Sequence, residues 1–246
     1  MLTKSEVKYI QSLSQKKERD ENGVFLVEGT KMTLELMRTV PHQIVMIYAV
    51  KAFYDTYESL FSPDKVKVVS EDELFKISQL QTPQQVVVVV KQEKYSCAPE
   101  NCKGWILALD GIRDPGNMGT ILRNADWFGI EQVLCSNDCV DIYNPKVVQA
   151  SMGSVLRVRF SYTDLTSFLK QYKHTVVAAT LDGVPMQSYQ FPEEGIMLIG
   201  NEGKGIREEV LSSISQKITI PSFGNAESLN AGVASGIVLW ELRRKG

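Results

Sequence analysis

Three polar turns in the second half of the sequence hold the side chains that are best suited to chemistry. In the first, LALDGIRDPGNMGTILRNADWFGI (107–130), an apolar strand runs into a turn rich in Gly, Pro, Asp and Asn, and a helix follows. Asn117 is predicted to cap the start of this helix, and Gly129 to end it. Arg123 lies off the apolar stripe of the helix, where its guanidinium could bind a phosphate through paired donors. A solvated arginine beside the exposed aromatic ring of Trp127 would produce the same pattern.

The second turn, MLIGNEGKGI (197–206), follows another apolar strand. Its three glycines allow a ligand to approach bare backbone, and Asn201 and Glu202 place polar groups at the edge of that approach. The turn lacks the Ser or Thr that follows Lys in a phosphate-binding Walker A loop, and it does not have the spacing of a dinucleotide fingerprint. Taken alone, it is also typical of many surface turns.

The third turn lies in ITIPSFGNAESLNAGVASGIVLWELRR (218–244), where a strand ends at Pro221 and a helix begins near residues 228–230. This helix contains Gly232 and Gly236, and a glycine inside a helix costs about 1 kcal/mol relative to alanine. The apolar stretch is too short to span a membrane. The glycines therefore predict that another backbone packs closely against this helix.

Strands and helices alternate along the chain, and they must position these turns. The alternation predicts βαβ units and mostly parallel sheets, with the run 86–90 as a central buried strand. Residues 1–91 are predicted to form one domain, 92–103 a linker and 104–246 a second domain. At the N-terminus, Thr3 and Glu6 have the spacing of a capping box.

Composition excludes several classes of protein. The 246 residues are 43% hydrophobic and carry a net charge of −2, as in an ordinary globular protein without a large basic footprint. The polar N-terminus has no apolar signal segment, which indicates a cytoplasmic protein without a membrane anchor. The spacing of the four cysteines fits reduced thiols better than a zinc site, so no metal is expected. Neither His42 nor His174 lies in one of the three turns, which disfavours histidine-based acid–base catalysis.

Taken in order, the three turns resemble the motifs of the SpoU (TrmH-like) family of RNA ribose 2′-O-methyltransferases. The resemblance covers about residues 105–244, and its first motif is matched by Asn117, Gly119, Arg123, Ala125 and Gly129. The second motif is matched by Gly200, Glu202, Gly203 and Gly205, and the third by Ile220, Pro221, Gly224, Ser228, Leu229 and Asn230.

The resemblance implies an α/β domain with a parallel sheet, tied into a deep trefoil knot, that binds S-adenosylmethionine and dimerises. The N-terminal half, including FLVEG (25–29), resembles the small ribosomal-protein-like α/β domain with which many members bind their substrate. The residues implied to be catalytic are Arg123, Asn117, Glu202, Ser228 and Asn230. Those implied to contact the cofactor are Thr180, Leu181, Gly200, Asn201, Gly203, Ile220 and Leu229. Arg123 is expected to act together with an RNA phosphate, because an arginine is an unlikely free base.

The expected substrate is RNA, with large-subunit rRNA favoured over tRNA. A catalytically silent RNA-binding or ribosome-assembly protein is the alternative from another class, and a dinucleotide-dependent oxidoreductase is disfavoured because its glycine fingerprint is missing. Two groups of basic residues are candidates for RNA contacts: Lys4, Lys8, Lys16, Lys17 and Arg19 near the N-terminus, and Arg243, Arg244 and Lys245 near the C-terminus.

Overall fold

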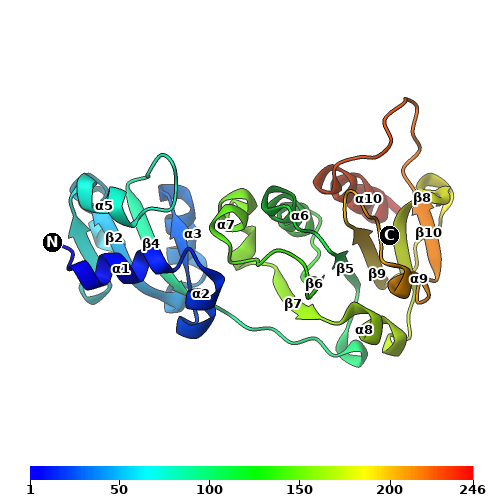
Figure 1. Cartoon of the computed structure of the whole chain (residues 1–246), viewed down its shortest axis with the longest axis horizontal. Coiled ribbons are helices and arrows are strands. Elements are labelled where there is room, and N and C mark those ends of the chain that lie inside the picture. Colours follow the sequence, from blue (N-terminus) through cyan, green and yellow to red (C-terminus); the bar gives the residue numbers. More distant parts are fainter. Residues whose placement is uncertain (246) are drawn as a thin grey trace. The chain divides into compact units, whose positions relative to one another are not determined.

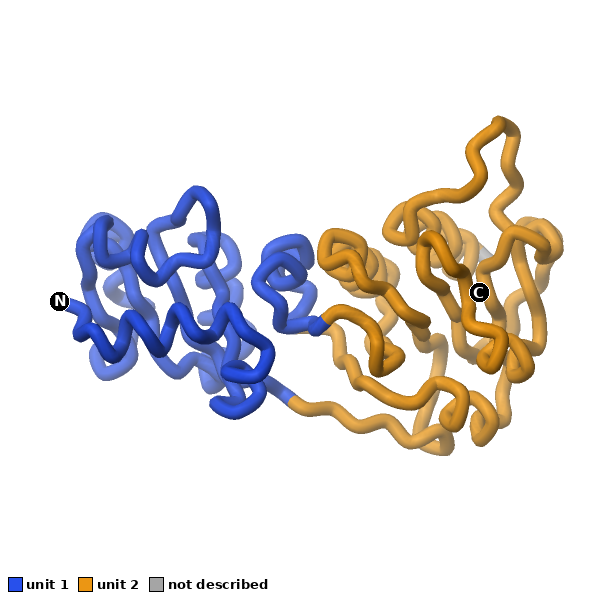
Figure 2. Tube along the Cα trace, viewed as in Figure 1, with its two compact units in different colours: residues 1–93, 141–156 blue, residues 94–140, 157–246 orange. Residues whose placement is uncertain are grey.

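The computed structural model describes residues 1–245, which divide into two compact units (Figures 1 and 2). Unit 1 comprises residues 1–93 and 141–156, and unit 2 comprises residues 94–140 and 157–246. None of the described helices is long and apolar enough to cross a membrane.

Unit 1 is a four-stranded sheet with helices. Its strands are β1 (Val24–Glu28), β2 (Ile44–Val50), β3 (Val66–Val69) and β4 (Val86–Lys91). Its helices are α1 (Lys4–Ser12), α2 (Lys16–Asn22), α3 (Thr30–Thr39), α4 (Lys51–Tyr57), α5 (Glu71–Ile77) and α7 (Pro145–Ser151). The predicted capping box of α1 is confirmed, because Thr3 and Glu6 exchange both of its hydrogen bonds.

The expectation of a mostly parallel sheet is wrong for unit 1. The strand order is β1-β4-β2-β3, and β4 runs antiparallel to both of its neighbours. Sequence alternation predicts which segments are strands and helices, but the loop 78–85 before β4 decides from which end that strand enters the sheet. The central position of β4 is confirmed, since Val86–Val90 are buried on both faces.

Residues 141–156 belong to unit 1, although the sequence places them inside the predicted second domain 104–246. Arg19 of α2 is almost fully buried, and its guanidinium pairs with the carboxylate of Asp141. The rings of Phe25 in β1 and Tyr143 lie 4.3 Å apart. These contacts hold the segment against unit 1, and they also remove Arg19 from the surface on which an RNA contact was expected.

Unit 2 contains the three turns. Its strands are β5 (Trp105–Asp110), β6 (Gln132–Ser136), β7 (Arg159–Thr163), β8 (Val176–Pro185), β9 (Gly195–Gly200) and β10 (Gln216–Thr219). Its helices are α6 (Pro115–Trp127), α8 (Leu165–Gln171), α9 (Glu208–Leu211) and α10 (Ala231–Lys245). The strand order is β10-β8-β9-β5-β6-β7, and every neighbouring pair is parallel, as predicted for this domain.

The sheet of unit 2 is covered on both faces. Ile106 and Ala108 of β5 pack in one apolar cluster with Leu165 and Phe168 of α8 and Val210 of α9. The opposite face carries α6 and α10, which contact each other and the strands. A parallel sheet needs such double cover because both faces of its strands are apolar.

The small-residue helix packs closely against α6, as expected, although the atoms nearest to its glycines belong to side chains and not to another backbone. A Cβ atom added to Gly232 of α10 would lie 2.9 Å from the Thr120 side chain of α6, and one added to Gly236 would lie 3.3 Å from Asn124. Asn124 Nδ2 donates hydrogen bonds to Gly232 O and to Ser235 Oγ, each at 2.8 Å. The glycines thus let α10 approach α6 closely enough for these side-chain bonds.

Segment 92–103, the predicted linker, has little regular structure, but it is not wholly solvent-exposed. Cys102 is buried in the same cluster as α8, and Cys97 packs against that cluster. The two Sγ atoms lie 2.8 Å apart, and all four cysteines are free thiols.

Candidate active site

A cavity of about 710 Å³ opens at the carboxyl ends of β8, β9 and β10. Ligands of parallel α/β sheets bind at this edge, and the volume lies within the ~300–1,000 Å³ typical of small-molecule sites. All seven residues expected to contact a cofactor line the cavity: Thr180, Leu181, Gly200, Asn201, Gly203, Ile220 and Leu229. Three segments that are distant in sequence therefore meet at one place.

The glycine turn after β9 is folded back tightly on itself. Asn201 and Gly205 exchange backbone hydrogen bonds of 2.9–3.0 Å. A Cβ atom on Gly200 would lie 2.5 Å from the carbonyl carbon of Gly205, so only glycine fits this position. Gly205 itself has a φ of +68°, a conformation that side chains rarely adopt.

Two anchors fasten this turn to the end of β5. Asn201 Nδ2 donates to Gly111 O at 2.8 Å, and its Oδ1 accepts from the backbone N–H groups of Gly203 and Lys204 at 3.0 Å. Directly after the turn, Arg207 donates its backbone N–H and its guanidinium to the carboxylate of Asp110, at 2.7–2.8 Å. The Asp110 side chain is 0% exposed, and its bonds raise the pKa of Arg207 above its usual value.

The cavity walls fit S-adenosylmethionine in chemical type. Ile220 and Leu229 offer apolar surface, while the glycine turn allows approach to backbone polar groups. The buried Thr180 hydroxyl lies close enough to the Asp182 carboxylate to help lower the pKa of that group.

At the rim, Asp182 pairs with Lys217 at 2.8 Å, and this bond lowers the pKa of the Asp182 carboxyl group below its usual value. Both residues line the cavity. At this point the rim thus carries one negative and one positive side chain, whose charges largely cancel.

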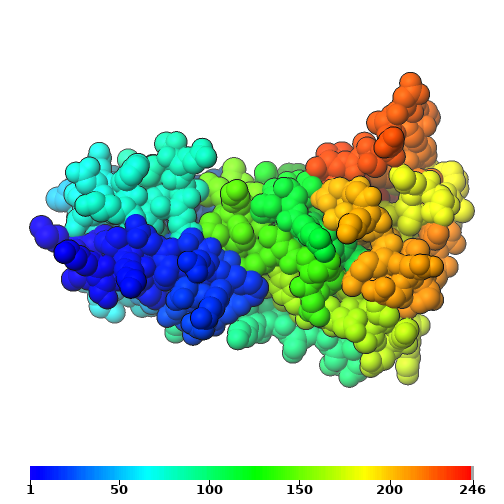
Figure 3. All heavy atoms as spheres, viewed as in Figure 1, coloured from blue at the N-terminus to red at the C-terminus, as the bar shows by residue number. Residues whose placement is uncertain are grey.

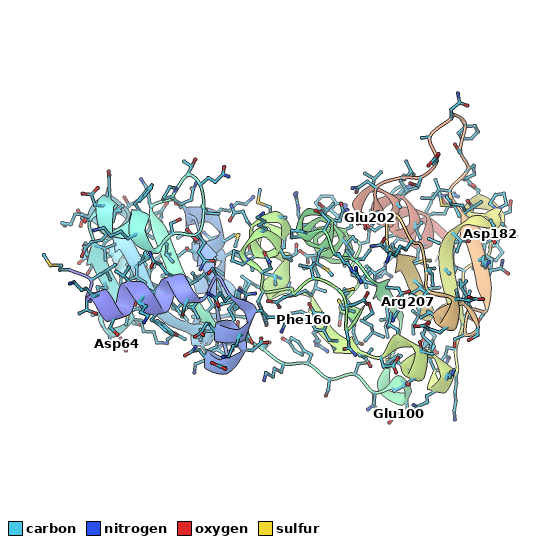
Figure 4. All side chains as sticks on the ribbon, viewed as in Figure 1. Asp64, Glu100, Phe160, Asp182, Glu202 and Arg207 are labelled. Carbon is cyan, nitrogen blue, oxygen red and sulfur yellow. The ribbon has the colours of Figure 1, made fainter. Side chains whose placement is uncertain are left out.

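A chain of hydrogen bonds joins one residue from each of the three turns. Asn230 Nδ2 donates to Asn117 Oδ1 at 2.7 Å, and Asn117 Nδ2 donates to Glu202 Oε1 at 2.5 Å. Glu202 lines the cavity beside the glycine turn, and Figure 4 labels it together with Arg207. The three residues were expected to act together, and the structure brings them into direct contact.

The prediction that Asn117 caps α6 is wrong. The cap is Asp114, whose carboxylate accepts the Asn117 N–H at 2.7 Å, while Pro115 occupies the first helical position. Proline has a suitable φ and no N–H that would need a partner there. Because Asp114 caps the helix, the side chain of Asn117 can form hydrogen bonds with Glu202 and Asn230 instead. Gly129, at φ +64°, follows the end of α6 as predicted.

The remaining two predicted catalytic residues lie in different settings. Ser228 lines the cavity and is exposed. Arg123 is exposed on α6 and is not among the residues that line the cavity. Asn117 and Asn230 do not line the cavity either, but they are joined to Glu202 by hydrogen bonds, whereas no hydrogen bond joins Arg123 to a predicted site residue among the bonds described.

The basic residues proposed for RNA contacts differ in their availability. Lys4 and Lys8 are exposed on α1, whereas Lys16 and Lys17 form ion pairs with acidic residues one turn along α2. Arg243 donates to the carbonyls of Phe128 and Gly129 at the end of α6, and Arg244 pairs with Glu241. The side chain of Lys245 lies outside the described residues.

Sequence reasoning missed Asp110, Arg207 and Phe223. Asp110 is the last residue of β5 and Arg207 follows the glycine turn, so both stood next to recognised motifs. Their pairing over a separation of 97 residues could not be read from spacing. Phe223 lines the cavity from the third turn and was not singled out.

The chain matches two family models. Residues 104–240 match the SpoU rRNA Methylase family, and residues 4–88 match the MRM3-like substrate binding domain. A relative in Bacillus subtilis (strain 168), the 23S rRNA (guanosine(2553)-2′-O)-methyltransferase RlmP, is 30% identical over 96% of this chain and 95% of its own length.

Solved structures show the same arrangement along the whole chain. A TrmH-family protein from Porphyromonas gingivalis superposes with a TM-score of 0.89 at 34% identity, covering 100% of both chains. An AdoMet-bound rRNA methyltransferase from Sinorhizobium meliloti superposes with a TM-score of 0.85 at 29% identity, covering 99% of this chain and 96% of that one. With more than half of its residues matched by the family model and a full-length relative at this identity, the chain belongs to the SpoU rRNA methylase family.

Proposed function

We propose that this protein transfers a methyl group from S-adenosylmethionine to a ribose 2′-hydroxyl of large-subunit rRNA. The observation that carries the proposal is the position of Glu202: it lies in the glycine turn that lines the cavity, and its carboxylate accepts from Asn117, which in turn accepts from Asn230. Glu202 thus joins the cofactor cavity to a polar cluster that could hold a hydroxyl group.

The reaction is an in-line displacement, so the hydroxyl must be aligned with the methyl carbon and must lose its proton. The bound cofactor would supply the electrophilic methyl group. Glu202 and Asn117 would orient the ribose, with Ser228 and Asn230 lining its place. Arg123 would bind the adjacent RNA phosphate, an oxygen of which would accept the hydroxyl proton, and would stabilise the charge that develops as this proton is transferred.

The choice of rRNA rests on the relatives and on unit 1. The B. subtilis relative is named for 23S rRNA, and the match over residues 4–88 is to a substrate-binding domain. We therefore assign the substrate to the 23S type of rRNA and the site of action to the cytoplasm, where a bacterial ribosome is assembled. tRNA is the alternative substrate.

We also propose a homodimer formed through α6 and α10. These helices pack on each other, yet Trp127 of α6 is 84% exposed and Trp240 of α10 is 57% exposed. Large exposed aromatic side chains are enriched at protein interfaces. Arg123 is exposed on the same helix as Trp127, so a dimer through this surface would place it at the protomer boundary.

Light scattering tests the dimer. The wild-type protein should have twice the chain mass of 27.6 kDa, and replacing Trp127 and Trp240 by serine should shift it toward the monomer. Leu60→Ser, which removes a comparably exposed apolar side chain from unit 1, is the control and should leave the mass unchanged. A wild-type monomer at all concentrations would refute the proposal.

We further propose that the chain of unit 2 is threaded into a deep trefoil knot. The support for this is the match of residues 104–240 to the SpoU family, whose methyltransferase domain the sequence motifs imply to be knotted. Knotted chains are rare exceptions among proteins. A crystal structure traced through residues 195–245 would test the threading, and an unthreaded path would contradict it.

Nucleoside mass spectrometry tests the activity. Purified 23S rRNA, tRNA and large ribosomal subunits are each incubated with protein and methyl-labelled S-adenosylmethionine, then digested. We expect a labelled 2′-O-methylnucleoside from rRNA or from subunits, and none with Arg123→Ala. If only tRNA were labelled, the substrate would be tRNA and not rRNA. No ribose methylation in any pool would favour a silent RNA-binding or ribosome-assembly protein.

A further inference from the structure

The loop between β10 and α10 carries an exposed aromatic side chain. This segment stands out from the rest of unit 2 in orange-red (Figures 1 and 3). Phe223 in this loop is 99% exposed, the highest value among the large apolar side chains of the described residues. Scattered exposed apolar residues are ordinary in proteins, so exposure alone carries no conclusion.

The position of Phe223 is what distinguishes it. The side chain lines the active-site cavity from its rim. Glu202 lines the same cavity. A molecule that presents a ribose to Glu202 would therefore enter a cavity that Phe223 helps to line.

This part of the loop is held by little else. Ser222 Oγ donates to Gly224 O at 3.2 Å, and a Cβ atom added to Gly224 would meet nothing within 4 Å. Gly224 thus has open space around it. The ring of Phe223 is free to be covered by a flat molecule without displacing any protein contact of the turn.

The charge of the loop indicates which part of an RNA it can bind. Between Pro221 and Asn230 the sequence PSFGNAESLN contains one charged residue, Glu227, and no Lys or Arg. Such a loop does not attract phosphates. An aromatic face binds nucleobases by stacking, which needs no charge and tolerates any base.

We propose that Phe223 stacks on a nucleobase of the substrate RNA next to the nucleotide that is methylated. This inference rests on the proposed function and deepens it, because it assigns a positioning contact for the RNA at the rim of the same site. The ring would hold the flanking base outside the cavity while the target ribose enters it.

The experiment measures methyl transfer to the responsive RNA at saturating S-adenosylmethionine with Phe223→Ala, Phe223→Trp and wild type. Loss of one base–aromatic stack corresponds to about a 10- to 100-fold loss of affinity. We expect Phe223→Ala to raise the KM for RNA by that factor, with kcat within about twofold of wild type, and Phe223→Trp to restore the KM. Calorimetry should give an unchanged cofactor Kd for all three proteins.

Asn225→Ala is the matched control, because Asn225 is exposed in the same loop and does not line the cavity. It should leave the KM for RNA near the wild-type value. A KM that is unchanged in Phe223→Ala overturns the proposal. So does a tenfold weaker cofactor Kd, which would make the ring a cover for the cofactor, or a changed dimer dissociation constant, which would place it against a second copy. A wild-type protein that methylates no RNA overturns the proposed function, and this inference with it.

Discussion

At the scale of single residues, Asn117 is the centre of the candidate site. Its amide nitrogen donates to Glu202 while its amide oxygen accepts from Asn230, so both polar atoms of the side chain are used. An asparagine can serve both neighbours at once because an amide has a donor and an acceptor. Aspartate could not donate to Glu202, and leucine of similar size could bond neither neighbour.

The substitution Glu202→Gln removes the charge of the side chain but keeps an oxygen that can accept the hydrogen bond from Asn117. Glutamine can still accept the Asn117 hydrogen bond through its amide oxygen, so the loop should keep its conformation. A carboxylate accepts a stronger hydrogen bond from a ribose hydroxyl than a neutral amide does, so we expect weaker orientation of the ribose and a kcat about 10-fold lower. Single-turnover methylation measures the loss. Unchanged kcat would show that Glu202 only holds the loop.

Ser228→Ala provides the comparison for that experiment. Ser228 lines the cavity, but it is not one of the three residues that the hydrogen bonds Asn230–Asn117–Glu202 join. We expect its loss to cost less than the loss of the Glu202 charge. An equal loss of kcat in both variants would mean that the hydrogen bonds among Glu202, Asn117 and Asn230 have no special role in methyl transfer.

At the scale of elements, the pair Asp110–Arg207 joins the end of β5 to the turn after β9. A buried carboxylate without its partner is strongly destabilising, which makes this pair a constraint on the turn. Glu202 belongs to this glycine turn. The pair therefore acts on the site through backbone placement and not by contact with the substrate.

Arg207→Lys should weaken this placement without removing the charge. Lysine cannot reproduce the two-nitrogen fork, although the backbone N–H bond to Asp110 remains. We expect the cofactor Kd, measured by calorimetry, to rise about 10-fold, the effect of losing one to two hydrogen bonds to a charged group. Arg157→Lys, in the exposed pair with Asp126, is the control and should leave the Kd unchanged. If both variants bind the cofactor like wild type, Arg207 does not position the turn.

The sequence predicted most elements of this fold because local patterns suffice for them. The run Val86–Val90, the capping box of Thr3 and the glycine stop at Gly129 each depend on residues a few positions apart. The start of α6 was misplaced by three residues because Asp114 and Asn117 are both good caps, and only Pro115 decides between them.

Features that depend on distant residues could not be predicted in the same way. Three such features depend on contacts between residues that are far apart in the sequence. They are the strand direction in unit 1, the burial of Arg19 against Asp141 and the pairing of Asp110 with Arg207. For the site, the resemblance gathered the cofactor residues correctly in one cavity, while their roles remain predictions. It also named Arg123, which lies outside that cavity in a single chain.

At the scale of the whole molecule, a net charge of −2 requires that RNA binding use local positive groups. Lys4, Lys8, Lys16 and Lys17 are all exposed, but Lys16 and Lys17 are already paired with Asp20 and Glu21. A lysine that neutralises a phosphate releases counterions when it binds, and this makes affinity depend on salt.

Salt titrations of RNA binding test that distinction. Replacing Lys4 and Lys8 by glutamine should reduce the slope of log K against log salt by about 1.4–1.8, the value for two phosphate contacts. The same replacement at Lys16 and Lys17 should change the slope less, because those ammonium groups already have partners. Equal slopes in wild type and in the Lys4 and Lys8 variant would remove α1 from the RNA-binding surface.

The inclusion of residues 141–156 in unit 1 has a consequence for how the protein is made. When the first 93 residues leave the ribosome, Arg19 has no Asp141 and Phe25 has no Tyr143. Unit 1 therefore lacks these two contacts until residues 141–156 have been synthesised, after the first strands of unit 2. For the same reason, we expect a chimera of two relatives that is joined within residues 92–103 to lose these contacts, and one that carries residues 141–156 along with residues 1–93 to keep them.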